Sequence, residues 1–204
     1  MAGAASGARP GAWTQGWWRG ARIIESPNHG PRPDGLPIEL VVLHSISLPP
    51  GQFGGDAVEQ LFTNRLDPSA HPSFEPLRGL AVSAHFFVRR DGEVLQFVSC
   101  DRRAWHAGVS CWQGRDNCND WSIGIELEGL EGDVFEQPQY LALATLMRAL
   151  RRRYPITLVA GHEHVAPVRK RDPGPGFDWS LLQRLLRWRL TIFPASLPGG
   201  GGAP

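Results

Sequence analysis

Several apolar runs along the chain have the pattern of β-strands. Residues 38–45, IELVVLHS, form a continuous apolar run that ends in a polar pair, as is typical of a strand buried on both faces. Residues 121–129 and 156–162 are similar runs, and each also ends in polar groups. Residues 83–98 predict two strands around Asp91-Gly92, a strong signal for a β-hairpin and therefore for antiparallel pairing.

Three further segments have the spacing of helices. Residues 54–66 place apolar side chains on one side, and residues 139–154 form an amphipathic pattern that stops at Pro155. Residues 178–190 predict a final helix, with Asp178 as its N-cap. Because strands and helices intermix, we predict an α/β fold, a single domain with a mixed central β-sheet flanked by helices.

The two ends of the chain differ from the centre in composition. We predict a flexible lead over residues 1–19, a domain over 20–190 and a disordered tail over 191–204, which includes the low-complexity stretch PASLPGGGGAP. The lead lacks the basic start and apolar run of a secretory signal. No segment approaches the roughly 20 apolar residues of a membrane span. We therefore expect a cytoplasmic protein with no membrane partner.

Charge and cysteine content narrow the classes of function further. The formal net charge of +1 gives no support to a nucleic-acid partner. Cys100, Cys111 and Cys118 form no C-x-x-C pair, so we expect thiols in a reducing compartment rather than a disulfide or a cysteine zinc site.

Polar side chains end the buried runs, and this pattern indicates a site. His44 and His162 each end a predicted strand, and Asp172 follows in a segment rich in proline and glycine, residues 161–179. Ligands of open α/β sheets bind beyond strand ends. Two imidazoles and one carboxylate leave a fourth position for water, which is typical of a catalytic zinc site.

Two charged residues complete the predicted chemistry. Glu126 would take a proton from the attacking water, and Lys170 would balance the charge that develops on a carbonyl oxygen. Pro173 holds Asp172 extended, and residues two apart in an extended segment face the same side. Lys170 and Asp172 are therefore expected to point into one cavity.

The residue pattern leaves alternatives open. His164 competes with His162 as a ligand, and two histidines with a carboxylate also bind non-haem iron. Histidines at strand ends are more often structural than ligating. We interpret His85 as a structural histidine of the sheet and His106, in AWHAGVS, as a residue of the substrate cleft.

Five blocks of the sequence resemble the zinc-dependent N-acetylmuramoyl-L-alanine amidases. In chain order they are VVLHSISLPPGQFGG, VSAHFFVRRDGEVLQFV, AWHAGVS, CNDWSIGIELEG and GHEHVAPVRKRDPGPGFDW. The resemblance covers residues 17–187 and is strongest to the cytoplasmic branch that acts on 1,6-anhydro-muropeptides. It implies an amidase/peptidoglycan-recognition-like fold, a Zn²⁺ cofactor and an anhydro-muropeptide substrate, and we expect a monomer.

The resemblance also selects among the open alternatives. It implies the metal ligands His44, His162 rather than His164, and Asp172, with Glu126 rather than Glu128 and Lys170 as the catalytic pair. Ala81 stands where relatives often carry a basic residue, so Arg115 or Arg78 is expected to hold the carboxylates of the peptide. The rival functions are a non-catalytic peptidoglycan-binding module and an amidase that acts on intact peptidoglycan.

Overall fold

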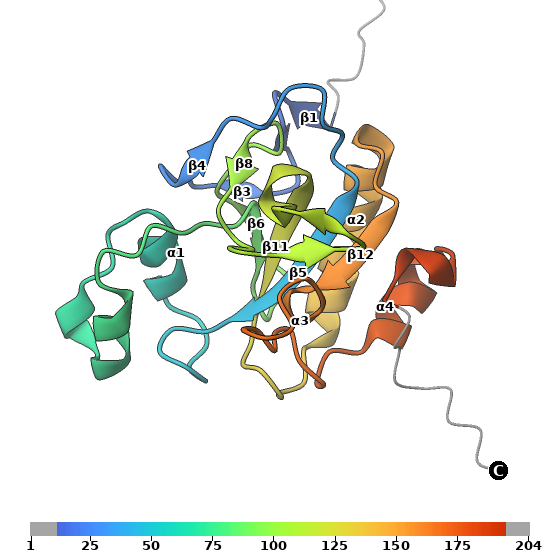
Figure 1. The fold of residues 1–204 in the computed structure, drawn as a ribbon. Helices are drawn as coiled ribbons and strands as arrows, with labels where there is room; N and C mark the ends of the chain where they lie inside the picture. The colour runs from blue at the N-terminus through green and yellow to red at the C-terminus, as the bar shows by residue number, and fades with distance from the viewer. Residues whose placement is uncertain (1–11, 195–204) are drawn as a thin grey trace, which may run out of the picture.

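A six-stranded mixed β-sheet forms the centre of the protein (Figure 1). The computed structural model describes residues 12–194. All neighbouring strands run parallel except β6 and β7, which form the predicted antiparallel hairpin. The predicted mixed sheet is therefore confirmed. In spatial order the strands are β12 (Leu158–Gly161), β5 (Leu40–Ile46), β11 (Ser122–Glu128), β6 (Phe86–Val88), β7 (Val94–Gln96) and β3 (Arg22–Ile23).

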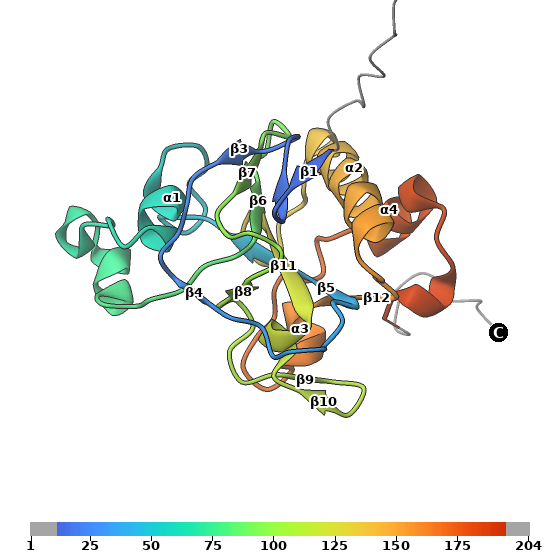
Figure 2. The same cartoon turned by 90° about the horizontal axis from the view of Figure 1, so that it is seen from above.

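The three predicted helices are present. The first and the last are shorter than the patterns indicated, and the middle one begins two residues and ends one residue earlier than predicted. The three helices are α1 (Ala57–Phe62), α2 (Gln137–Arg153) and α4 (Trp179–Leu186). Figure 2 shows α2 and α4 lying together on one side of the sheet. A fourth helix, α3 (His162–Val165), was not predicted, because its single turn lies in a segment interpreted as irregular.

The alternation of side chains along the strands separates a structural face from a functional face. Val41 and Leu43 of β5, with Ile125 of β11, pack into the core under α2 and α4. In a strand, successive side chains point to opposite faces. His44 and Glu126 are paired in register on these parallel strands, so both lie on the face away from α2.

Shorter elements surround this sheet, and the sequence patterns did not predict them. The two-stranded ribbons are β1 (Trp13–Thr14) with β2 (Trp17–Trp18), β4 (His29–Gly30) with β8 (Arg103–Ala104), and β9 (Cys111–Trp112) with β10 (Arg115–Asp116). The 3₁₀ turns are η1 (Pro68–Ala70), η2 (Pro72–Leu77), η3 (Cys118–Asp120) and η4 (Leu190–Ile192).

Residues from both predicted flanks pack into the core. Trp18 is buried under α2, although it falls in the predicted lead, and Ile192 and Phe193 of the predicted tail are buried in the same cluster. Burial of large apolar side chains stabilises the folded state, which explains why these flanks pack against the core. Residues 1–11 and 195–204, the outer parts of the lead and tail, lie outside the described residues. Within residues 12–194, no helix is long and apolar enough to cross a membrane.

Candidate metal centre and cleft

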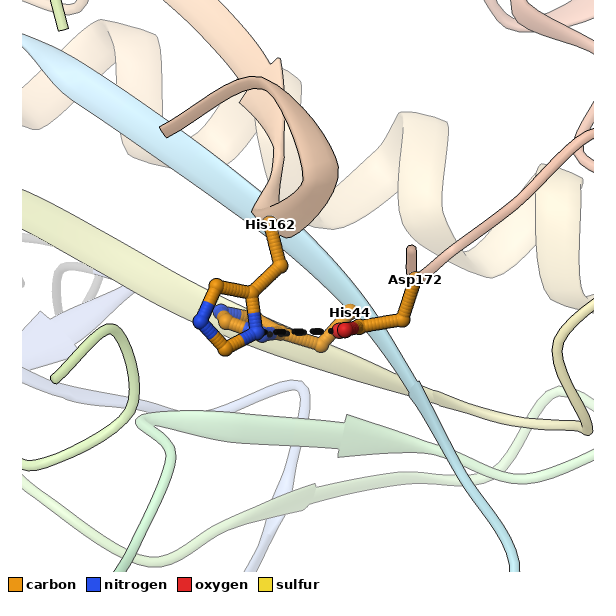
Figure 3. A group of neighbouring side chains, drawn as sticks. All are labelled: His44, His162 and Asp172. Atoms are coloured by element: carbon orange, nitrogen blue, oxygen red, sulfur yellow. Dashed lines mark hydrogen bonds and ion pairs between the residues drawn. The ribbon is translucent and has the colours of Figure 1, made fainter. Parts of the chain in front are cut away.

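Three side chains that are distant in the sequence meet at one point (Figure 3). His44 Nδ1 lies 2.9 Å from His162 Nδ1 and 3.3 Å from Asp172 Oδ2, and His162 Nδ1 lies 3.1 Å from the same oxygen. A tetrahedral zinc ion with bonds of about 2.0–2.1 Å sets its ligand atoms about 3.3 Å apart. The spacing of these three atoms therefore fits such an ion.

The register of the sheet brings the two histidines together. β12 runs parallel to β5 with Gly161 opposite Leu43, so His162, the first residue of α3, follows β12 beside His44. The backbone N–H of Glu163 donates to the carbonyl of Asp172 over 2.8 Å and holds the loop against α3. A Cβ atom on Gly161 would lie 2.8 Å from Cδ of Pro173, so this close approach requires glycine.

The protonation of these groups favours a cation between them. The carbonyl of Ala107, 3.3 Å from His162 Nε2, can only accept a hydrogen bond, so it places the proton of the neutral ring on Nε2 and leaves Nδ1 with a lone pair. Burial, and then the neighbouring His162, lower the pKa of His44 to about 4. Burial alone would raise the pKa of Asp172, but the adjacent rings of His162 and His44 hold that pKa below its usual range. Two imidazole nitrogens and a carboxylate oxygen thus face one another, which suits a metal site.

Glu126 and Glu128 lie on the same strand but in different environments. Glu128 Oε1 accepts from the backbone N–H of Gly54 over 2.6 Å, its Oε2 accepts from the N–H of Arg90 over 3.0 Å, and Arg89 lies 3.7 Å away. Glu126 lies 4.0 Å from His44 Nδ1, and its buried Oε2 has no hydrogen-bond partner among residues 12–194. Glu126 is therefore the glutamate with an uncommitted oxygen beside the candidate metal ligands.

The charge state of Glu126 depends on burial and on its neighbours. Burial raises its pKa well above the usual value, the adjacent Asp172 raises it further, and Lys170 opposes both effects. A carboxylate with a raised pKa is suited to proton transfer near neutral pH. Lys170 lines the same cleft as Glu126 and Asp172, so its ammonium group is placed to meet a bound partner there.

A cleft of about 290 Å³ opens over this group of side chains. Its polar side includes Glu126, Lys170 and Asp172, so Lys170 and Asp172 do line one cavity, as their spacing predicted. Much of the remaining lining is apolar. The apolar lining residues are Ile46, Leu48, Leu61, Phe62, Leu77, Leu80, Val82 and Trp105.

Comparison with known proteins places the chain in a family. The family model described as N-acetylmuramoyl-L-alanine amidase matches residues 34–175. The chain belongs to the N-acetylmuramoyl-L-alanine amidase family. It is 52% identical over 179 residues to the 1,6-anhydro-N-acetylmuramyl-L-alanine amidase AmpD of Escherichia coli, a match that covers 87% of this chain and 98% of that protein.

Solved structures agree with this assignment to the amidase family. The crystal structure of a selenomethionine derivative of AmpD is similar with a TM-score of 0.83 and 51% identity, over 85% of this chain and 98% of that chain. The amidase AmiD of Escherichia coli, in a complex with anhydro-N-acetylmuramic acid-L-Ala-D-γ-Glu-L-Lys, is similar with a TM-score of 0.54 and 30% identity, over 74% of this chain and 59% of that chain. The predicted amidase-like fold is therefore confirmed.

Arg78 and Arg115, the two arginines expected to bind the substrate, are not among the residues that line the cleft. Arg78 pairs with Glu75 over 2.7 Å, and the side chains of both are mostly exposed. Arg115 pairs with Glu39 over 2.6 Å and lies over the ring of Trp121 at 3.9 Å. Each guanidinium would have to leave an acidic partner in order to bind a substrate carboxylate.

The other candidate histidines occupy distinct places. His164 Nδ1 accepts from the backbone N–H of Gly161 over 2.9 Å, and its ring contacts Trp112 and Trp179, so it faces away from the three converging atoms. His85 is fully buried, and its Nδ1 accepts from the backbone N–H of Gly124 over 3.0 Å, which confirms a structural role. His106 lines the cleft, as the sequence predicted.

The sequence did not indicate the backbone carbonyl of Ala107 as a partner of His162. A carbonyl group is present in every residue, so no side-chain pattern marks it. The only signal was indirect, because Ala107 follows His106 in the block AWHAGVS.

Proposed function

We propose that this protein hydrolyses the amide bond between N-acetylmuramic acid, in its 1,6-anhydro form, and L-alanine in muropeptides during cell-wall recycling. The observation that carries the proposal is the meeting of His44, His162 and Asp172 beside Glu126, with His162, Asp172 and Glu126 lining one cleft. Membership of the amidase family supports it, as does the similarity to AmpD and to AmiD with its anhydro-muramyl peptide.

We propose zinc as the resident metal, held by Nδ1 of His44, Nδ1 of His162 and Oδ2 of Asp172. When bound, zinc supplies a Lewis acid that polarises the amide carbonyl and makes water reactive near neutral pH. The nearly equal separations of the three atoms support this assignment.

Glu126 and Lys170 are proposed as the groups that move and balance charge. Glu126 takes a proton from the attacking water as its oxygen adds to the amide carbon, and then delivers that proton to the nitrogen of L-alanine as the C–N bond breaks. The ammonium group of Lys170 stabilises the negative charge on the former carbonyl oxygen. The products are a carboxylic acid on the sugar and a peptide with a free amino group.

The cleft accounts for the proposed substrate class. Its apolar lining suits the sugar ring and the lactyl methyl group, while its polar side meets the amide. Arg78 and Arg115 remain the proposed contacts for the carboxylates of the peptide. We also propose a cytoplasmic monomer: every candidate residue comes from one chain, and the three cysteines are free thiols, as is usual in reducing compartments.

A comparison of substrates tests the proposal. Purified protein is incubated with a soluble anhydro-muropeptide, with the matching non-anhydro-muropeptide and with intact sacculi, and the products are identified by mass spectrometry. We expect release of anhydro-N-acetylmuramic acid and the intact peptide from the first substrate, and little release from sacculi. Binding of the muropeptide without cleavage would contradict the proposal and favour a binding module, and preferential digestion of sacculi would favour an amidase of intact peptidoglycan.

A further inference from the structure

The segment that contains His106 and Ala107 touches both candidate metal histidines. His106 Nδ1 lies 3.0 Å from His44 Nε2, and the carbonyl of Ala107 lies 3.3 Å from His162 Nε2. The ring nitrogens of His44 and His162 that face away from the candidate metal position therefore meet two consecutive residues of one segment. Such outer partners orient metal-binding imidazoles and fix their tautomers.

Several contacts hold His106 in this position. Oδ1 of Asn119 accepts from the backbone N–H of His106 over 3.1 Å and from that of Ala107 over 2.8 Å. His106 Nε2 lies 3.2 Å from the hydroxyl oxygen of Ser122. The ring packs edge-on against His44, with ring centroids 5.1 Å apart. The side chain of His106 is thus fixed by the protein before any substrate is bound.

Gly124 of β11 provides the space that the ring of His106 occupies. A Cβ atom on Gly124 would lie 2.3 Å from Cγ of His106, a distance at which the ring would have to move. This explains why a strand of otherwise larger residues contains glycine at that position. The sheet itself is therefore shaped to bring His106 against His44.

The hydrogen bonds define the direction of proton donation. His44 can present a lone pair at Nδ1 only if its single proton is on Nε2. His44 Nε2–H then donates to His106 Nδ1, and His106 Nε2–H donates to the hydroxyl of Ser122. Both ring nitrogens of His106 are committed to the protein, and neither is left for a hydrogen bond to a substrate.

We propose that His106 is a positioning residue that fixes the tautomer and orientation of His44 for metal binding, and is not a residue that recognises the substrate. This inference rests on the metal site of the proposed function. It replaces the expectation, drawn from the sequence, that His106 binds the substrate. The ligands themselves do not change, but their affinity for the metal depends on the hydrogen bond from His44 to His106.

Zinc affinity of two variants tests this role without an activity assay. Zinc-free wild type, His106→Leu and His106→Asn are titrated with zinc in competition with a chromogenic chelator. Leucine removes the acceptor, and loss of such an outer partner typically weakens metal affinity 10–100-fold, so we expect about that loss for His106→Leu. Asparagine places Oδ1 where Nδ1 was, so His106→Asn should retain most of the wild-type affinity.

Other outcomes of the titration would overturn the inference. Wild-type affinity in His106→Leu, or equal losses in both variants, would contradict it. So would a rise in KM for muropeptide in His106→Asn with unchanged zinc affinity, because that pattern belongs to a substrate contact. If the wild type itself binds no zinc, the failure lies with the metal site and therefore with the proposed function.

The tautomers provide a second test that does not depend on a folded variant. Long-range ¹⁵N–¹H spectra of the metal-free wild type report which nitrogen of each ring carries the proton. We expect protons on Nε2 of both His44 and His106. A proton on Nδ1 of His106 would contradict the inference even if His106→Leu fails to fold.

Discussion

At the scale of single residues, Glu126 and Glu128 show how environment separates two identical groups. Both project to the same face of β11, because two positions along a strand restore the direction of the side chain. Glu128 is committed to Gly54, Arg89 and Arg90, whereas Glu126 lines the cleft and its Oε2 has no hydrogen-bond partner among residues 12–194. The carboxylate of Glu128 thus connects loops, and that of Glu126 is available for proton transfer.

Substitution of Glu126 should therefore lower turnover, whereas substitution of Glu128 should lower stability. Glu126→Gln should lower kcat by a factor of about 10²–10⁴, the usual contribution of a positioned base, and should leave zinc binding intact. The matched variant Glu128→Gln should keep turnover but lose stability, by about 1–3 kcal/mol, because a buried acceptor of backbone hydrogen bonds is weakened. Steady-state kinetics and denaturant melts measure both effects. Near-normal turnover in Glu126→Gln would refute its role as the base.

The sequence predicted the candidate site residues better than their partners. The ends of the apolar runs indicated His44, His162 and Glu126, because strand ends can be recognised from the pattern. The choice of Glu126 over Glu128 came only from the resemblance, since the contacts that distinguish them come from residues 54, 89 and 90. Long-range contacts of this kind leave no periodic signal.

At the scale of elements, the long helices and central strands were predictable and the short elements were not. The cap of α4 was predicted from Asp178, whose side chain accepts from the N–H of Leu181 over 2.8 Å. The end of α4 was placed too late, because Arg187 takes a left-handed conformation, with φ of 56°, that the sequence does not mark with glycine. Ribbons with two residues in each strand are too short to show any periodicity.

The N-cap of α4 provides a test of this element alone. Asp178→Ala removes the side-chain acceptor for the first turn and should lower the free energy of unfolding by about 0.5–2 kcal/mol. Ser180→Ala, in the same turn but outside the cap, is the matched control and should change stability little. Both variants should keep wild-type kcat, since α4 lies across the sheet from the cleft. Equal stability of Asp178→Ala and wild type in urea melts would show that the cap contributes nothing.

At the scale of the whole molecule, the order of the strands creates the site. The sequence predicted five of the six strands of the sheet, all except β3, but not the adjacency of β12, β5 and β11, which depends on crossovers between distant segments. That adjacency places His162 beside His44 and pairs Glu126 in register with His44. The tertiary pairing of strands therefore assembles a cluster that the sequence presents as separate residues.

The dependence of activity on zinc tests this assembly most directly. Chelated, metal-free protein is titrated with zinc, and hydrolysis of the anhydro-muropeptide is measured at each addition. We predict that activity rises in proportion to zinc and reaches its plateau at one equivalent per chain, and that His162→Ala shows no rise at stoichiometric zinc. Full activity of the wild type in the absence of metal, or full activity of His162→Ala, would contradict the claim that His44, His162 and Asp172 together hold the ion required for hydrolysis.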